Sequence, residues 1–275
     1  MSQKIKYISR LRDEFDTVIC GVNGVVLNGT RVDAAAVDAL IKMYQSGKKV
    51  MLASNLSFRV IDLFCLLKEA GVPMNIFYAM ITAGEMTHFY LQNTDDLGHR
   101  YLNLTSRPSE LMRGLPYAET RLPDNADFVL AETTVDGIDL QACMPVLDQA
   151  LRRQLPLLCV GNNTSVVTDG GLREGAGAVA EQYALLGGQI IPFGKPDVRI
   201  AAYLTENIAN FSSDRCLVIG DCMATDMRLG NAFKAKTLLL TGGVHQLLDA
   251  QSQQIDVLSA NYGLHVDYYT ENLQW

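Results

Sequence analysis

Five residues of this sequence have the side-chain types that bind a phosphoryl group. A hydroxyl and an amide stand at Ser54 and Asn55, an ammonium at Lys195, and two carboxylates at Asp221 and Asp226. Hydroxyl and backbone N–H groups bind phosphate oxygens, a lysine offsets their charge, and paired carboxylates are ligands that Mg²⁺ accepts. If the fold brings these groups together, the sequence predicts a site for a phosphorylated ligand and a metal ion.

Most of these residues follow a short apolar run typical of a buried strand. Four runs have this character: Thr17–Val22, Lys49–Ala53, Leu155–Val160 and Arg215–Ile219. Apolar residues repeat with helical spacing in Asp33–Ser46 and Val60–Ala70, and a glycine follows each segment, as at the end of a helix. Strands that alternate with helices indicate an α/β fold with a parallel sheet. Ligands of such sheets bind beyond the carboxyl ends of the strands, where these residues stand.

The middle of the chain differs from its two ends. Strand-like pieces and a helical stretch at Gln141–Arg153 are separated there by proline and glycine breaks. We predict that residues 84–186 form an inserted, smaller α/β domain, and that residues 1–83 and 187–275 form the core. The core sheet is expected to resume at Gln189–Pro192. Two loop residues of the insert, Asn162 and Asn163, are candidates for contact with the ligand.

Composition limits the class of protein. Hydrophobic residues make up 48% and charged residues 19% of the chain, with a net charge of -7, so a basic surface for nucleic acid is not expected. No apolar run approaches the roughly 18 residues that a membrane span needs. The first residues lack the apolar segment of a secretory signal, so we expect a cytoplasmic protein with reduced, buried cysteines. The sequence leaves the oligomeric state open, a homo-oligomer included.

The order of the motifs resembles that of the haloacid dehalogenase (HAD)-like hydrolase superfamily. It is closest to the class IIA group of capped phosphatases, such as pyridoxal phosphatase and 4-nitrophenyl phosphatase. The resemblance covers nearly the whole chain and is carried by four segments: Thr17–Gly29, Leu52–Asn55, Gly194–Asp197 and Gly220–Asp226. It implies a Rossmann-like parallel-sheet core with an inserted α/β cap of type C2, and Mg²⁺-dependent hydrolysis of a phosphomonoester.

The resemblance also implies a role for each residue. Ser54, Asn55 and Lys195 would bind the phosphate, with Lys195 taking part in catalysis. Asp221 and Asp226 would hold Mg²⁺. The plainer alternatives are that Ser54 and Asn55 only begin a helix, that Lys195 is a solvated loop residue, and that the two acids are loop and capping residues. The four histidines show no spacing typical of a metal site.

The first motif departs from the family pattern Asp-x-Asp-Gly-Val. In the family, its first aspartate attacks phosphorus and its second is the general acid and base. Aligning the Gly-Val pair places Gly21 at the nucleophile position and Asn23 at the acid/base position. Asp16 lies about 16 Å away along an extended strand, and Cys20 should point to the opposite strand face, so neither is expected to substitute.

Two hypotheses follow from this departure. Glycine cannot form a covalent intermediate and asparagine cannot transfer the proton, which favours a catalytically impaired homologue, a pseudoenzyme that binds a phosphorylated small molecule or partner. Loss of the first-motif carboxylate should also weaken Mg²⁺ binding. The alternative is an active, slow Mg²⁺-dependent phosphatase of a small phosphorylated metabolite, because the phosphate-side residues remain.

Overall fold

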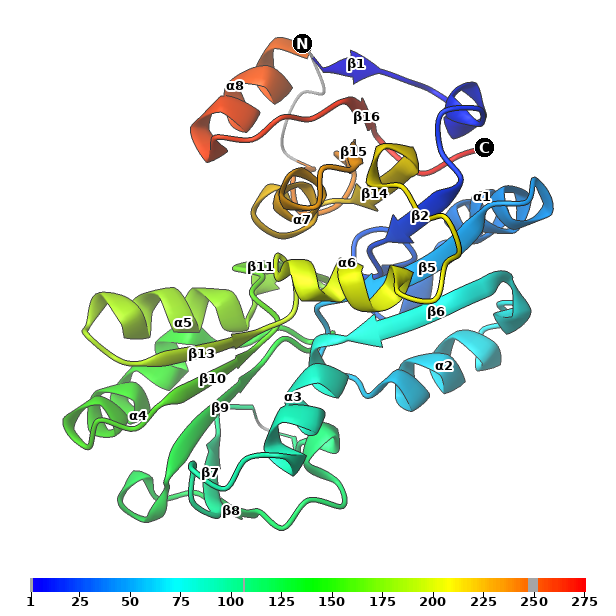
Figure 1. Ribbon diagram of the computed structural model, residues 1–275. Helices are drawn as coiled ribbons and strands as arrows, with labels where there is room; N and C mark the ends of the chain where they lie inside the picture. Colours follow the sequence, from blue (N-terminus) through cyan, green and yellow to red (C-terminus); the bar gives the residue numbers. More distant parts are fainter. Residues whose placement is uncertain (1, 106, 247–251) are drawn as a thin grey trace. The chain divides into compact units, whose positions relative to one another are not determined.

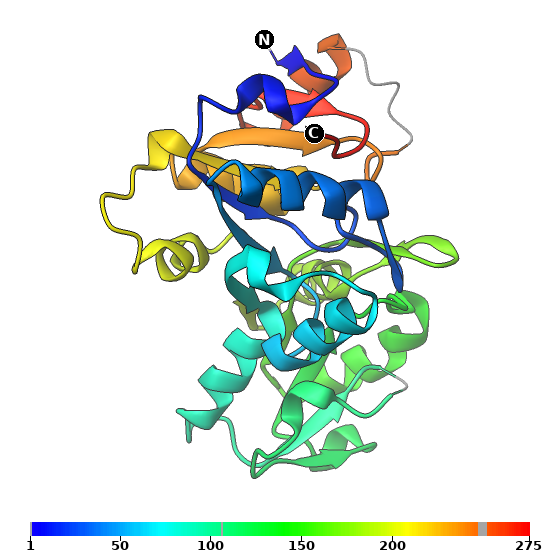
Figure 2. The same ribbon diagram turned by 90° about the vertical axis from the view of Figure 1, so that its right-hand side faces the viewer.

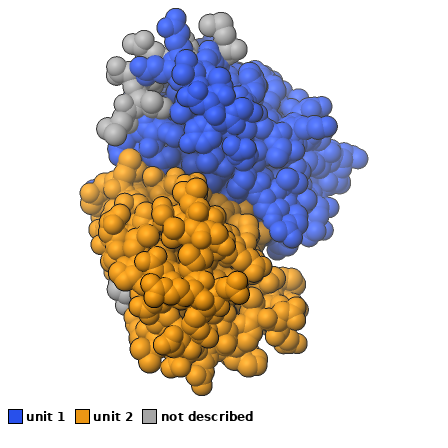
Figure 3. Space-filling view, turned by 90° about the vertical axis from the view of Figure 1, so that its left-hand side faces the viewer, with its two compact units in different colours: residues 1–54, 64–81, 195–275 blue, residues 55–63, 82–194 orange. Residues whose placement is uncertain are grey.

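The computed structural model describes residues 2–105, 107–246 and 252–275, which form two compact units (Figures 1 and 3). One unit, here the core unit, comprises Met1–Ser54, Phe64–Ile81 and Lys195–Trp275. The other, here the cap unit, comprises Asn55–Leu63 and Thr82–Gly194. Within the described ranges, no helix combines the length and the apolar character needed to cross a bilayer.

The core unit is built on a seven-stranded sheet with the order β1-β16-β15-β14-β2-β5-β6. Its strands are β1 (Gln3–Lys4), β2 (Thr17–Cys20), β5 (Lys49–Ser54), β6 (Phe77–Thr82), β14 (Cys216–Gly220), β15 (Lys236–Leu240) and β16 (Tyr268–Thr270). Strands β14, β2 and β5 lie in the middle, are apolar on both faces, and pair in parallel. Ile219, Cys20 and Leu52 are side by side, so the carboxyl ends of the three strands meet at one edge.

Helices surround this sheet, and a small hairpin follows β2. The helices are α1 (Ala34–Gln45), α2 (Val60–Glu69), α6 (Val198–Thr205), α7 (Arg228–Ala232) and α8 (Ser252–Tyr262), and the hairpin pairs β3 (Leu27–Asn28) with β4 (Arg31–Val32). Helix α1, the blue helix of Figure 2, contacts β5 and buries Leu40 and Met43 completely. It begins at Asp33, whose carboxylate accepts hydrogen bonds from the N–H groups of Ala35 and Ala36 at 2.9 Å.

The cap unit has its own five-stranded parallel sheet, with the order β13-β10-β9-β7-β8. The strands are β7 (Arg100–Asn103), β8 (Ala118–Thr120), β9 (Phe128–Glu132), β10 (Leu157–Val160) and β13 (Ile190–Phe193), with a hairpin of β11 (Ser165–Thr168) and β12 (Gly171–Glu174). Helices α3 (Ala83–Gln92), α4 (Leu140–Arg152) and α5 (Ala176–Leu185) complete it. Along β9, Val129 and Ala131 join one apolar cluster and Phe128 and Leu130 join another, so both faces are covered.

One strand assignment from the sequence is wrong. The segment expected to resume the core sheet, Gln189–Pro192, instead forms β13, which pairs with β10 at the edge of the cap sheet. Local apolar character identifies a strand but not the sheet that it joins. As a consequence, the cap unit runs to residue 194 rather than 186, and it also includes residues 55–63.

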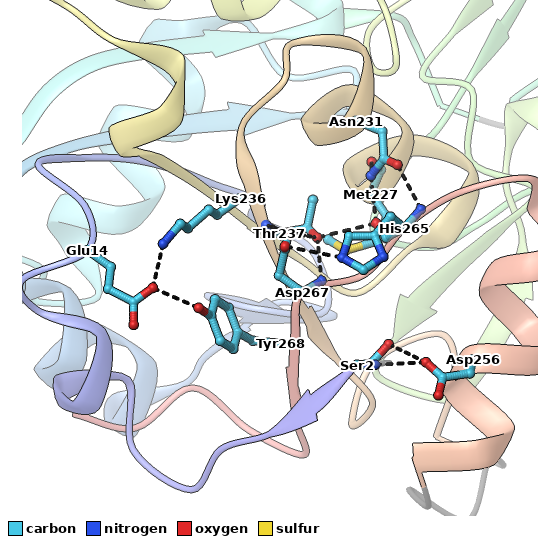
Figure 4. A network of polar contacts seen from close by, with 10 residues as sticks. All are labelled: Ser2, Glu14, Met227, Asn231, Lys236, Thr237, Asp256, His265, Asp267 and Tyr268. Atoms are coloured by element: carbon cyan, nitrogen blue, oxygen red, sulfur yellow. Dashed lines mark hydrogen bonds and ion pairs between the residues drawn. The ribbon is translucent and has the colours of Figure 1, made fainter.

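A polar network ties the last strand to helix α7 (Figure 4). The N–H and hydroxyl of Thr237 both donate to Asp267 Oδ2 at 2.9 Å. The Asn231 side-chain amide donates to the carbonyl of His265 and accepts from its N–H, each at 2.7 Å. These bonds hold the C-terminal segment against the helix that follows the candidate ligand Asp226.

The cap helices provide a matched pair of leucines for testing the packing. Leu147 of α4 is fully buried and Leu185 of α5 is 81% exposed. We expect Leu147→Ala to lower the free energy of unfolding of the cap unit by about 2–5 kcal/mol, because truncation leaves a cavity. Leu185→Ala should change it by less than about 0.5 kcal/mol. Guanidinium unfolding of both variants checks this, and equal losses would contradict the assignment of α4 to the cap core.

Candidate active site

A buried ion pair lies at the carboxyl edge of the central core strands. Lys195 Nζ donates to Asp226 Oδ1 and to the carbonyl oxygen of Ala53, both at 2.7 Å. The two charged side chains are only 5% and 3% exposed. The lysine ammonium is therefore fixed at the end of β5 by an acid that follows β14, whereas the sequence analysis had assigned Lys195 to phosphate and Asp226 to Mg²⁺.

Local backbone geometry places Asp226 beside Lys195. After β14 the chain forms one π-helical turn, Met223–Met227, and the N–H of Cys222 donates to Asp226 Oδ2 at 3.3 Å. A Cβ on Gly220 would lie 2.0 Å from Asp226 Cγ, a distance that no side chain tolerates. Glycine at position 220 is thus what allows the carboxylate to fold back under the strand end.

Asp221 is enclosed by backbone from two other loops. Its Oδ2 accepts a hydrogen bond from the N–H of Val244 at 2.9 Å. A Cβ on Gly24 or Gly243 would lie 1.9 or 2.2 Å from the same oxygen, so both positions require glycine. Burial, and then the negative charge of Asp226, raise the pKa of Asp221 to about 7.

Gly21 lies directly in front of the ion pair. A Cβ built on it would be 3.3 Å from Asp226 Oδ1 and 3.5 Å from Lys195 Nζ. Its φ angle is outside the left-handed region, so the backbone here would accept a side chain with small adjustments of its neighbours. Any side chain at position 21 would therefore point into the site, and a carboxylate could reach the lysine.

Known proteins resemble this chain along most of its length. The family model described as HAD-hydrolase-like matches residues 192–263, which include the Lys195 and Asp226 segments. Chronophin from Rattus norvegicus is 26% identical over 270 residues, which cover 93% of this chain and 85% of chronophin. A haloacid dehalogenase-like hydrolase from Brucella suis has 23% identity and a TM-score of 0.82 over 98% of this chain and 99% of its own.

The chain is similar in sequence and in fold to proteins of the HAD-like hydrolase superfamily. Its parallel core sheet and inserted parallel cap sheet match the class IIA fold. A glycerol phosphate phosphatase from Mycobacterium tuberculosis, solved in complex with magnesium, has the same fold, with 20% identity and a TM-score of 0.65 over 98% of this chain and 77% of its own. The chain is thus a homologue of HAD phosphatases.

The cysteines near the site are not suited to replace a nucleophilic aspartate in this HAD homologue. The Cys20 thiol donates to the carbonyl of Gly21 at 3.2 Å. Burial raises the pKa of Cys20 to about 12 and that of Cys222 to about 11, so both remain thiols at neutral pH. Among the six cysteines, Cys65 is exposed, contrary to the expectation that all would be buried.

The asparagines predicted to contact the ligand make hydrogen bonds within the cap unit. The Asn55 side-chain amide donates to Asn163 Oδ1 at 2.7 Å, and that of Asn162 donates to the carbonyl of Phe193 at 3.2 Å. All three asparagines belong to the cap unit, whereas Ser54, the last residue of β5, belongs to the core unit and is 3% exposed. Contact of these side chains with a ligand stays a prediction.

The sequence analysis missed a loop that borders Asp221. This loop follows β15 and carries Val244 and His245, and His245 Nε2 accepts a hydrogen bond from the N–H of Met223 at 3.3 Å. Burial lowers the pKa of His245, which favours the neutral imidazole that this bond requires. The apolar run Lys236–Leu240 followed by Thr-Gly-Gly is the signal that could have identified the strand and its loop.

The acidic side chains that the structure describes do not provide a full set of metal ligands. Within residues 2–105, 107–246 and 252–275, no group of three or more Asp, Glu, His or Cys side chains gathers in a way that could hold a metal ion. Asp226 is already engaged by Lys195, which leaves Asp221 as the acid best placed for a cation. Mg²⁺ commonly binds through one or two carboxylates together with substrate phosphates and water. The residues present fit that mode only in combination with a bound phosphate.

The buried pair makes a specific prediction about stability. Lys195→Met should lower the free energy of unfolding of the core unit by about 3–5 kcal/mol, because Asp226 would stay buried without a counter-ion. The double variant Lys195→Met/Asp226→Asn should recover most of that loss. Lys42→Met, which breaks the exposed pair with Asp38, should cost at most about 1 kcal/mol. Urea unfolding of the three variants measures these values, and no recovery in the double variant would argue against the pairing.

Proposed function

We propose that this HAD homologue binds a phosphate monoester at the carboxyl ends of β2, β5 and β14 and does not hydrolyse it through an aspartyl-phosphate. The observation that carries the proposal is the glycine at position 21. A side chain there would lie beside both Lys195 and Asp226, at the position where the family resemblance places the nucleophile. Gly21 offers no atom that could attack phosphorus.

The charge distribution supports phosphate binding. Lys195 is held rigidly at the strand ends, so no side-chain entropy has to be lost when a phosphate arrives. Ser54 lies at the end of the neighbouring strand β5, where a hydroxyl and backbone N–H groups suit phosphate oxygens. These groups stabilise a bound phosphate whether or not the bond to its ester oxygen is broken.

We further propose that Mg²⁺ joins this site together with the phosphate ligand rather than before it. Asp221 would be its protein carboxylate, with Asp226 close by. Bound Mg²⁺ would neutralise charge on the phosphoryl oxygens. The number of available oxygen ligands supports this order. Asp226 is already paired with Lys195, so the two buried acids alone offer few ligands, and a phosphate dianion would supply the further oxygens that Mg²⁺ needs.

The residue at the acid/base position also argues against rapid hydrolysis. Asn23 stands at the acid/base position of the resemblance, and an amide cannot exchange a proton with the leaving group. General acid–base catalysis is worth roughly 10²–10⁴-fold in rate. Loss of both the nucleophile and this contribution predicts turnover far below that of an intact phosphatase.

The second candidate is an active Mg²⁺-dependent phosphatase. It is favoured by the comparisons, because the glycerol phosphate phosphatase of the same fold is described as an enzyme and was solved with magnesium. Such an activity would need water as the nucleophile, positioned by Lys195 and Asp221. Electrostatic stabilisation by these groups can support slow reaction when a nucleophile is missing.

Restoring the family motif distinguishes the two candidates. We expect Gly21→Asp/Asn23→Asp to hydrolyse 4-nitrophenyl phosphate with Mg²⁺ at least roughly a hundredfold faster than the unaltered chain, because the covalent route becomes available. Release of 4-nitrophenolate gives the rate. Asn23→Asp alone is the matched control and should remain as slow as the unaltered chain, because it still lacks a nucleophile.

A parallel titration tests binding directly. Isothermal titration of the unaltered chain with inorganic phosphate and Mg²⁺ should give a saturable signal that neither component gives alone. Ordinary turnover by the unaltered chain would reject the proposal in favour of the second candidate. Absence of phosphate binding in both the unaltered chain and the double variant would reject both candidates.

A further inference from the structure

The cap unit contains a cavity that the strand-end site does not use. It has a volume of about 120 Å³ and lies beyond the carboxyl end of β9. Its wall includes the apolar side chains of Leu56, Phe58 and Val135 and the carboxyl group of Glu132. One buried water needs only about 10–15 Å³ on the same kind of measure, so the cavity has room for a small organic group.

Glu132 is an unusual residue for such a position. It is the last residue of β9 and only 3% exposed, yet its Oε1 has no hydrogen-bond partner among the residues that the structure describes. The hydroxyls of Ser109 and Ser57 lie close enough to this carboxyl to lower its pKa by hydrogen bonding, which leaves Oε1 as the atom of interest. A buried acceptor without a partner is destabilising, so its presence on a cavity wall points to a donor that arrives with a ligand.

The charges around the cavity favour a cation. Three acids line it, Glu110, Glu132 and Asp136, against one base, Arg107. Asp136 is paired with Arg107 at 3.0 Å and Glu110 is paired with Arg113, so Glu132 is the acid of this wall without an ion pair among the described residues. A metal ion is disfavoured, because no cluster of three metal-ligating side chains is found among the described residues. A small organic ammonium group matches both the volume and the excess of acceptors.

The ionisation of Glu132 is poised for such a ligand. Burial raises the pKa of this carboxyl to about 7, and the negative charge of Glu119 adds to the shift. The hydroxyls of Ser109 and Ser57 oppose it. Tyr101, the other titratable group that interacts with Glu132, has a pKa raised to about 12 and stays neutral. A cation beside the carboxyl would therefore drive loss of its proton.

We propose that this cap cavity binds the ammonium group of a small primary amine, with Glu132 as its principal acceptor. When the carboxyl is protonated, binding exchanges its proton for the ammonium ion, and the proton goes to solvent. When it is already ionised, binding releases no proton. The inference rests on cap residues alone and does not depend on phosphate binding or on catalysis in the core unit.

Titration with 2-aminoethanol tests the proposal on the unaltered chain. We expect calorimetric binding at millimolar concentration and no comparable binding of ethane-1,2-diol, which has a hydroxyl in place of the ammonium. Titration in two buffers of different ionisation enthalpy gives the number of protons released. More protons per ligand should be released at pH 6 than at pH 8, because the raised pKa of the Glu132 carboxyl leaves more of it protonated at the lower pH.

Two variants separate the role of Glu132 from general effects. Glu132→Gln keeps the shape but not the charge, and it should weaken 2-aminoethanol binding roughly tenfold or more and abolish the proton release. Glu181→Gln, at an exposed position outside the cavity wall, is the control and should change neither.

Three results would overturn the proposal: equal binding of the amine and the diol, proton release that does not change between pH 6 and pH 8, or unchanged binding in Glu132→Gln. The first two are measured on the unaltered chain, so they hold even if the variant fails to fold.

Discussion

The ion pair between Lys195 and Asp226 is the interaction on which the candidate site depends. Removing two charges from water is costly, and the cost is offset only when the geometry is good and the remaining hydrogen-bonding capacity is used. Here the lysine also bonds the carbonyl of Ala53, and the other oxygen of the aspartate accepts from a backbone N–H. The pair thereby joins β5, β14 and the loop before α6 at one point.

The two buried aspartates, Asp226 and Asp221, determine which nearby positions are glycine. Gly220 leaves the space that Asp226 fills, and Gly24 and Gly243 leave the space around Asp221. Gly21 differs from these three, because a Cβ there would make only close contacts that small shifts relieve. Packing therefore requires glycine at three of the four positions. At position 21 it does not, so contacts with neighbouring atoms do not explain the glycine there.

Electrostatics distinguishes this site from one with a full set of carboxylates. With Lys195 opposing Asp226 and the pKa of Asp221 near 7, the buried groups carry little net charge at neutral pH. An additional carboxylate at position 21 would add a negative charge in a poorly solvated place and would need a cation to balance it. With glycine at position 21, the site has one buried negative charge fewer for a cation to balance than it would have with a carboxylate there.

The sequence was sufficient to predict the strands whose apolar runs are continuous. Strands β2, β5 and β14 are buried on both faces, which leaves a recognisable pattern, and the residues at their ends came together as expected. The same pattern could not assign β13 to a sheet, because sheet membership is decided by contacts with residues such as Leu157, far away along the chain. His245 was missed for a related reason, since its strand was not recognised.

Fold and chemistry give different kinds of information about this molecule. Similarity over almost the whole chain to proteins of one fold reflects shared packing of two parallel sheets, which many activities tolerate. Chemistry depends instead on single atoms at the strand ends, since attack on phosphorus through an aspartyl-phosphate needs a carboxylate at one particular position. Glu132 is the converse case. One oxygen of its buried carboxyl has no hydrogen-bond partner within the described residues and lies on the wall of a cavity, so packing alone does not account for it.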